Sequence, residues 1–183
     1  MSRSNGKTEK PIALVGLMGA GKSAVARVLG ERLGASVADL DTMIEAVEGR
    51  TIADLFAQSG EAWFRRREGE LLGKVLNQGV RVIACGGGVV TDARHRRVLR
   101  ERCRVVWLEV SPTEAARRIA AQAADPAGVR PLLAGGTPAA RLTELLAERE
   151  SLYAEVAHAR VRTDGLDAEQ AADAVMLALD GKA

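Results

Sequence analysis

Residues 16–23 read Gly16-Leu17-Met18-Gly19-Ala20-Gly21-Lys22-Ser23 and match the pattern G-x-x-x-x-G-K-S. The apolar run Ile12–Val15 precedes this stretch, and residues 24–33, which are apolar at helical spacing and end before Gly34, follow it. A buried strand, a glycine-rich loop and a helix in this order are the context in which the pattern forms a phosphate-binding loop. The sequence therefore predicts a nucleoside triphosphate site near the start of the chain.

The residue types of this loop suit a triphosphate. Glycines let backbone N–H groups surround phosphate oxygens with no side chain in the way. Lys22 supplies a positive charge to the β- and γ-phosphates, and Ser23 has the hydroxyl that ligates the accompanying Mg²⁺. The residues expected to bind the nucleotide here are Gly19, Ala20, Gly21, Lys22, Ser23 and Ala24.

The composition indicates one domain with nearly balanced charge. The 183 residues carry 26 Lys and Arg against 24 Asp and Glu, so no overall field would recruit nucleic acid or a membrane. Cys85 and Cys103 lack C-x-x-C spacing, which argues against zinc and against a secreted disulfide framework and favours the cytoplasm. We expect a loose, polar N-terminal arm over residues 1–10 and a single domain over residues 11–183.

Strand-like and helix-like stretches alternate along the chain. Strands are predicted at Ile12–Val15, Ser36–Ala38, Val80–Cys85, Arg104–Val110 and Arg160–Arg162. Helix starts are indicated by the capping-box sequence Ser111–Glu114, by Thr51 with Asp54, and by Thr137-Pro138. This alternation predicts a parallel sheet wrapped by helices, with ligands at the carboxyl ends of its strands.

Acidic and basic residues follow the strand ends. Asp39 and Asp41 come after the second strand, so one carboxylate can serve a metal and the other an acceptor hydroxyl; a helix N-cap is the alternative reading of either. Residues 65–67 are three consecutive arginines, which cannot share one helix face. At least one can point into a cleft, although a solvated basic face paired with Glu68 and Glu70 is the alternative.

Two further stretches are candidates for the site. Gly86-Gly87-Gly88 follows a predicted strand at its carboxyl end, where a ligand can touch bare backbone, or where the glycines form a flexible turn. Arg130 lies in a small-residue segment with Pro131, and Arg149 lies in a later helix. Arginines near a phosphate site add positive charge where charge develops in the reaction.

Taken in chain order, these stretches resemble the motif series of the shikimate kinase family. The series is GLMGAGKS, D-x-D, F-R-x-x-E, G-G-G, R-P-L-L and R-x-x-L-Y, and the resemblance runs from about Ile12 to Leu179. It implies a P-loop three-layer α/β/α fold like that of nucleoside monophosphate kinases, with a five-stranded parallel sheet and a mobile lid over about residues 122–136. It also implies transfer of the γ-phosphoryl group of ATP, with Mg²⁺, to the 3-hydroxyl of shikimate.

The resemblance carries roles onto particular residues. Asp41 would hold the hydroxyls of shikimate, Arg65 and Arg149 its carboxylate, and Gly86, Gly87 and Gly88 would line the same pocket. Asp39 would reach Mg²⁺ beside Ser23, Arg130 would be the lid arginine at the phosphates, and Arg118 would lie near the adenine. The catalytic set is then Lys22, Asp41 and Arg130.

Two other functions are compatible with parts of the sequence. A gluconate or nucleotide kinase of the same fold is less compatible with Asp41 beside two arginines and with few aromatic residues. Nucleic-acid binding through the six arginines between residues 94 and 104 is the reading from a different class, but such a run is more often the solvated face of a helix. We expect a monomer with a small-molecule substrate and no nucleic-acid or membrane partner.

Overall fold

The computed structural model describes residues 10–122 and 137–181. The strands are β1 (Ile12–Val15), β2 (Val37–Asp39), β3 (Val82–Ala84), β4 (Arg104–Glu109) and β5 (Ala159–Arg162). The helices are α1 (Lys22–Leu33), α2 (Leu40–Glu48), α3 (Ile52–Asn77), α4 (Ala93–Arg102), α5 (Pro112–Gln122), α6 (Pro138–Val156) and α7 (Ala168–Asp180), with the short 3₁₀ helix η1 (Val89–Thr91). Lys10 and Gln122 apart, the predicted arm over 1–10 and lid over 122–136 lie outside the described residues.

The five strands form one parallel sheet in the order β2-β3-β1-β4-β5, which confirms the predicted α/β fold. Ile12 is paired with Val82 on one side and with Arg104 on the other. The predicted strand starting at Val80 begins two residues later, because the Val80 N–H donates to Val75 O and so closes the end of α3.

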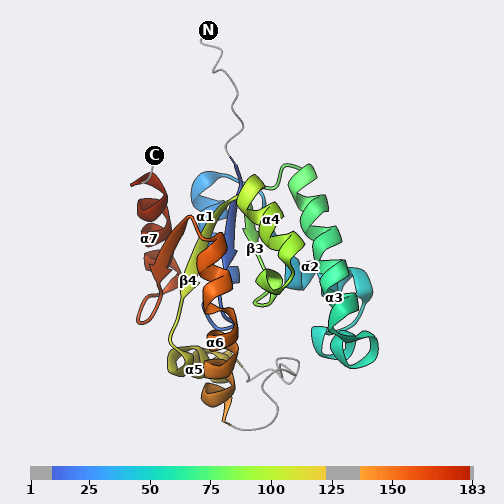
Figure 1. The fold of residues 1–183 in the computed structure, drawn as a ribbon. Helices are drawn as coiled ribbons and strands as arrows, with labels where there is room; N and C mark the ends of the chain where they lie inside the picture. Colours follow the sequence, from blue (N-terminus) through green and yellow to red (C-terminus); the bar gives the residue numbers. More distant parts are fainter. Residues whose placement is uncertain (1–9, 123–136, 182–183) are drawn as a thin grey trace.

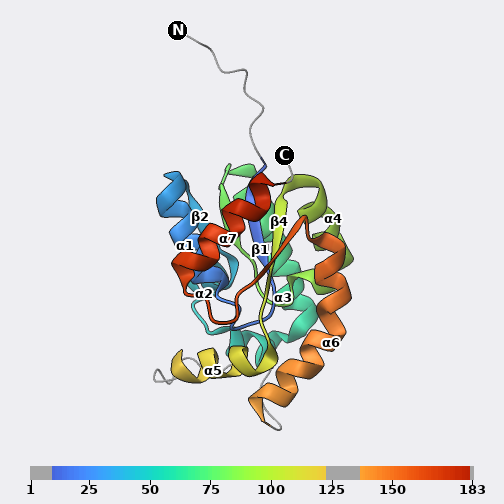
Figure 2. The ribbon, with the colours of Figure 1, turned by 90° about the vertical axis from the view of Figure 1, so that its left-hand side faces the viewer.

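Side chains that alternate along the strands build a core on each face of the sheet. Ile12 and Leu14 pack with α1 and α7, whereas Ala13 and Val15 pack with α3, α4 and α6. Figures 1 and 2 show α1 and α7 on one side of the strands and α3 and α4 on the other. The arrangement is the predicted three-layer sandwich.

The predicted helix starts are largely as expected. Thr51 accepts from the Asp54 N–H, and Thr137 accepts from the Ala140 N–H. The box at Ser111 is only half formed: its hydroxyl accepts from the Glu114 N–H, but the Glu114 carboxylate binds arginines instead of the Ser111 N–H.

The strand order decides where ligands can sit. Strand β1 lies between β3 and β4. Helix α1, which connects β1 to β2, packs on one face of the sheet, and α4, which connects β3 to β4, packs on the other face. The loops after β1, β3 and β4 therefore meet at one carboxyl edge, the lower edge in Figure 1, with α5 beneath it. Among the described helices, none combines the length and the apolar character that crossing a membrane requires.

Candidate active site

The loop after β1 has the backbone of a phosphate cradle. Gly16 has φ 140° and Gly19 has φ 81°, conformations that residues with a side chain rarely adopt. A Cβ at Gly16 would also lie 2.3 Å from the Leu108 carbonyl oxygen. The loop delivers its backbone to the start of α1, where no side chain caps the helix and where Ser23 and Ala24 are exposed. The N-terminus of a helix favours anions.

Lys22 lies over this cradle. Its Nζ donates to the carbonyl oxygens of Gly16 and Leu17, each at 3.0 Å. The ammonium group is thus held at the loop, at the end of α1 that attracts negative charge.

Arg118 on α5 ties the loop to the segment after β5. Its NH1 donates to Gly19 O at 3.4 Å and to Thr163 Oγ1 at 3.3 Å, and its NH2 donates to the carbonyl oxygens of Thr163 and Leu166. Its Nε donates to Glu114 Oε1 at 2.7 Å. The residue that the resemblance assigned to adenine therefore lies beside the phosphate cradle, with each of its N–H directions directed at a protein oxygen.

The three consecutive arginines separate as helix geometry requires. Arg67 is half-buried at the surface and pairs with Glu70, as the solvated alternative expected, and with Glu48, which that alternative did not include. Arg65 instead is buried, with 9% of its side chain exposed, and packs 5.2 Å above the centroid of the Phe64 ring. Its NH1 donates to the Glu68 carboxylate at 2.7 Å.

Gly86 and Gly88 bring bare backbone against these charged groups. A Cβ at Gly88 would lie 2.1 Å from NH2 of Arg65. A Cβ at Gly86 would lie 2.5 Å from Glu68 Oε1 and 2.7 Å from Asp41 Oδ1. Arg65, Glu68 and Asp41 therefore all lie against the backbone of the glycine loop.

Helix α6 contributes a second buried guanidinium group. Arg149, 6% exposed, donates from NH1 to Gly87 O at 3.4 Å, and the Tyr153 hydroxyl donates to the same oxygen. Within the described part of the chain, Nε of Arg149 has no hydrogen-bond partner. Burial raises the pKa of Tyr153 to about 12, so this hydroxyl stays protonated and can donate.

Glu68 is the site residue whose position sequence reasoning missed. It is fully buried, and burial, only partly offset by Arg65, raises its pKa from 4.5 to about 7. The neighbouring charge of Asp41 raises this pKa further, and that of Arg149 lowers it. The signal was present in the F-R-x-x-E spacing, which places Glu68 three residues after Arg65 on the same helix face.

Asp39 and Asp41 flank the start of α2. Asp39 is its N-cap and accepts from the Thr42 N–H at 3.1 Å, so the capping alternative holds for this residue. Over residues 10–122 and 137–181, no group of three or more His, Cys, Asp or Glu side chains could hold a metal ion. Ser23 and Asp39, which the resemblance assigns to the metal, offer oxygen atoms, the ligand type that Mg²⁺ takes alongside phosphates and water.

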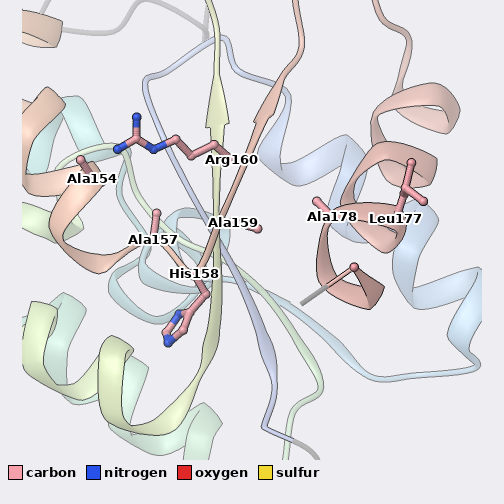
Figure 3. Close-up of a pocket in the computed structure, with 8 residues that line it drawn as sticks. Ala154, Ala157, His158, Ala159, Arg160, Leu177 and Ala178 are labelled. Atoms are coloured by element: carbon pink, nitrogen blue, oxygen red, sulfur yellow. The ribbon is translucent and has the colours of Figure 1, made fainter. Parts of the chain in front are cut away.

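The remaining predicted residues fall elsewhere. Arg130 lies outside the described residues. The arginine run lies on α4 except for Arg104, which begins β4. Arg94 is exposed and pairs with Asp92, and Arg96 pairs with Glu155. A pocket of about 510 Å³ lies at the amino end of β5, and half of the residues that line it are alanines; His158 and Arg160 lie beside them in Figure 3. Because it opens at the sheet edge opposite the phosphate cradle, it is not the candidate active site.

Comparisons with known proteins identify the family of this chain. Residues 18–180 match the family model described as shikimate kinase. A shikimate kinase from Symbiobacterium thermophilum is 46% identical over 153 residues, which cover 84% of this chain and 86% of that protein. One from Streptomyces avermitilis is 43% identical over 171 residues, covering 93% and 96%.

The fold of this chain also matches a solved structure of the same family. The shikimate kinase from Acinetobacter baumannii, in complex with shikimate, matches with a TM-score of 0.87 at 37% identity and covers 96% of each chain. These matches establish the family. This chain belongs to the shikimate kinase family.

Proposed function

We propose that this chain transfers the γ-phosphoryl group of ATP to the 3-hydroxyl of shikimate, with the residue roles set out below. The observation that carries the acceptor assignment is the convergence of Arg65 and Arg149, both about nine-tenths buried, on the glycine loop. Planar guanidinium groups bind a carboxylate bidentately, which lysine cannot do. A small acid with hydroxyl groups fits a pocket that also contains Asp41.

Asp41 is proposed to hold the hydroxyl that receives the phosphoryl group. Its Oδ1 lies beside Gly86, where no side chain separates it from the acceptor space. A loose transition state needs little removal of the hydroxyl proton early in the reaction. Asp41 therefore acts mainly by positioning the hydroxyl oxygen and accepts its proton late.

Lys22 is proposed to stabilise the charge on the transferred group. Its Nζ would exchange the carbonyl oxygens of Gly16 and Leu17 for phosphate oxygens. Ser23 and Asp39 would hold Mg²⁺, which when bound neutralises phosphate charge. Arg130 would add charge at the phosphates, and Arg118 would lie beside the adenine.

An ADP-release assay with alternative acceptors tests the proposal. We expect turnover with shikimate in the presence of ATP and Mg²⁺, and little with quinate, gluconate or AMP. Equal turnover with gluconate or AMP would overturn the acceptor assignment, and full turnover in excess chelator would overturn the metal requirement. The monomeric state and the cytoplasmic location stay predictions.

A further inference from the structure

His95 occupies a buried space beside Glu68, next to the proposed acceptor site. It lies on α4 and is 5% exposed. A Cβ at Gly69 of α3 would lie 2.4 Å from its Nε2, so the imidazole fills the space that any other residue at position 69 would occupy. Gly69 has no positive φ, so its backbone does not require glycine. A glycine inside a helix lowers the stability of the helix by about 1 kcal/mol relative to alanine. Here the space that His95 needs explains why position 69 is a glycine.

The imidazole faces the carboxylate that holds Arg65. Nδ1 of His95 lies 3.7 Å from Glu68 Oε2, the same oxygen that accepts from Arg65 NH1 at 2.7 Å. Among the described residues, neither His95 Nδ1 nor Glu68 Oε1 has a hydrogen-bond partner. His95, Glu68 and Arg65 thus form a continuous line from α4 to the glycine loop.

The imidazole acts without a charge of its own. Burial lowers the pKa of His95 below its ordinary value of 6.5, and Arg65 and Arg94 lower it further. Asp92 and a hydrogen bond to the Val89 backbone oppose this effect. At neutral pH a neutral ring therefore packs against Glu68 and does not compete with Arg65 for its carboxylate.

Arg65 has a second carboxylate partner, which lies toward the surface. Glu61, 58% exposed, accepts from Nε and NH2 of Arg65 at 3.4 and 3.3 Å. If the Glu68 side chain were free to turn into an empty space at position 95, Arg65 would be drawn toward Glu61. The guanidinium group would then leave the edge of Gly88.

We propose that His95 is a positioning residue of the acceptor site, which fixes Glu68 and through it the guanidinium group of Arg65. The inference rests on the proposed function, since it assigns His95 to the binding of the shikimate carboxylate. It assigns His95 no contact with either substrate. Removal of the imidazole should therefore weaken the binding of shikimate and leave the binding of the nucleotide unchanged.

Steady-state kinetics of His95→Ala test this split. We expect the KM for shikimate to rise by roughly three- to tenfold, the size of one misaligned hydrogen bond, with the KM for ATP and kcat within about twofold of wild type. His95→Asn, which keeps a polar side chain beside Glu68, should recover most of the loss. The control is Leu99→Ala, because Leu99 is fully buried on the same helix and does not belong to the line. It should lower Tm while the shikimate KM stays unchanged.

Two double variants separate positioning from packing. Gly69→Ala with His95→Ala adds a methyl group to the emptied space, so it should recover Tm while the shikimate KM stays high. In a Glu68→Gln background, His95→Ala should have no further effect on that KM. An unchanged shikimate KM in His95→Ala, or an equal rise in Leu99→Ala, would overturn the inference. No turnover of shikimate by the wild type would instead overturn the proposed function.

Discussion

Replacing Gly88 by alanine tests the acceptor pocket without removing any of its charged groups. The new Cβ would lie 2.1 Å from NH2, 2.6 Å from Cζ and 2.9 Å from NH1 of Arg65. These contacts are shorter than real Cβ atoms show, and all three belong to the movable end of one side chain. The backbone of the loop therefore stays in place, and the guanidinium group of Arg65 moves away.

The size of the effect follows from what Arg65 loses. Arg65 must retreat by roughly 1 Å, a displacement that can cost about 100-fold when it misaligns a binding group. Loss of a hydrogen bond to a charged group costs roughly 1.5–3 kcal/mol, so the shikimate KM should rise by about 10- to 150-fold. Loosening the buried pair with Glu68 should cost roughly 1–3 kcal/mol of stability, less than a fully ionised pair would lose, because Glu68 can take up a proton near neutral pH.

The assay is an ADP-release titration of each substrate, with Tm measured on the same samples. Gly73→Ala is the matched control, since it lies in α3 and its Cβ would meet nothing within 4 Å. We expect Gly88→Ala to raise the shikimate KM and to spare the ATP KM, and Gly73→Ala to change neither. A folded Gly88→Ala enzyme with a shikimate KM within twofold of wild type would refute the placement of the acceptor beside Arg65.

Three further outcomes are expected. Lys22→Ala should lower kcat by roughly 100-fold with shikimate affinity intact, because its charge is directed at the nucleotide phosphates; a selective loss of shikimate affinity in calorimetry would contradict this. Asp41→Asn should weaken shikimate binding by about 10- to 150-fold. The rate at saturating shikimate should fall as well, at the low end of a range of roughly 10²–10⁴-fold, so Kd and kcat are measured separately. The raised pKa of Glu68 means that its carboxyl group binds a proton more tightly in the folded protein than in the unfolded chain. Protonation of Glu68 therefore stabilises the fold fully below pH 4.5, and this stabilisation is lost as the pH rises through about 7. Glu68→Gln should therefore gain roughly 1–3 kcal/mol relative to wild type between pH 4.5 and pH 8 in urea unfolding, and a difference independent of pH would contradict the assignment.

The fold was predictable because its signals are local. The order of a strand, a glycine-rich loop and a helix is compatible with few folds, and the alternation of strand-like and helix-like stretches predicted all five strands of the parallel sheet. Strand ends were less predictable, since the role of Val80 depends on a hydrogen bond to Val75 in the preceding helix. The break at Gly60, where φ is 76° inside the residues of α3, was likewise not predicted.

The site was predictable in its composition and not in its internal contacts. The sequence shows that three consecutive arginines diverge, but only packing on Phe64 and contact with Gly88 select Arg65. The spacing of Arg65 and Glu68 is the same as that of Arg67 and Glu70, yet the first pair is buried and the second lies on the surface. Burial, which turns an ordinary i,i+3 pair into part of a binding site, depends on neighbours distant in the sequence.

The setting of Arg118 has a consequence for how the chain distinguishes one nucleotide from another. The N–H groups of its guanidinium group donate to oxygens of Glu114, Gly19, Thr163 and Leu166, so a nucleobase can contact only the flat face of the group. A flat cation attracts any planar ring and does not read the donors and acceptors along its edge. In the role proposed for it, Arg118 would hold a purine in place without recognising which purine it is, and a preference for ATP over GTP would come from other groups of the protein.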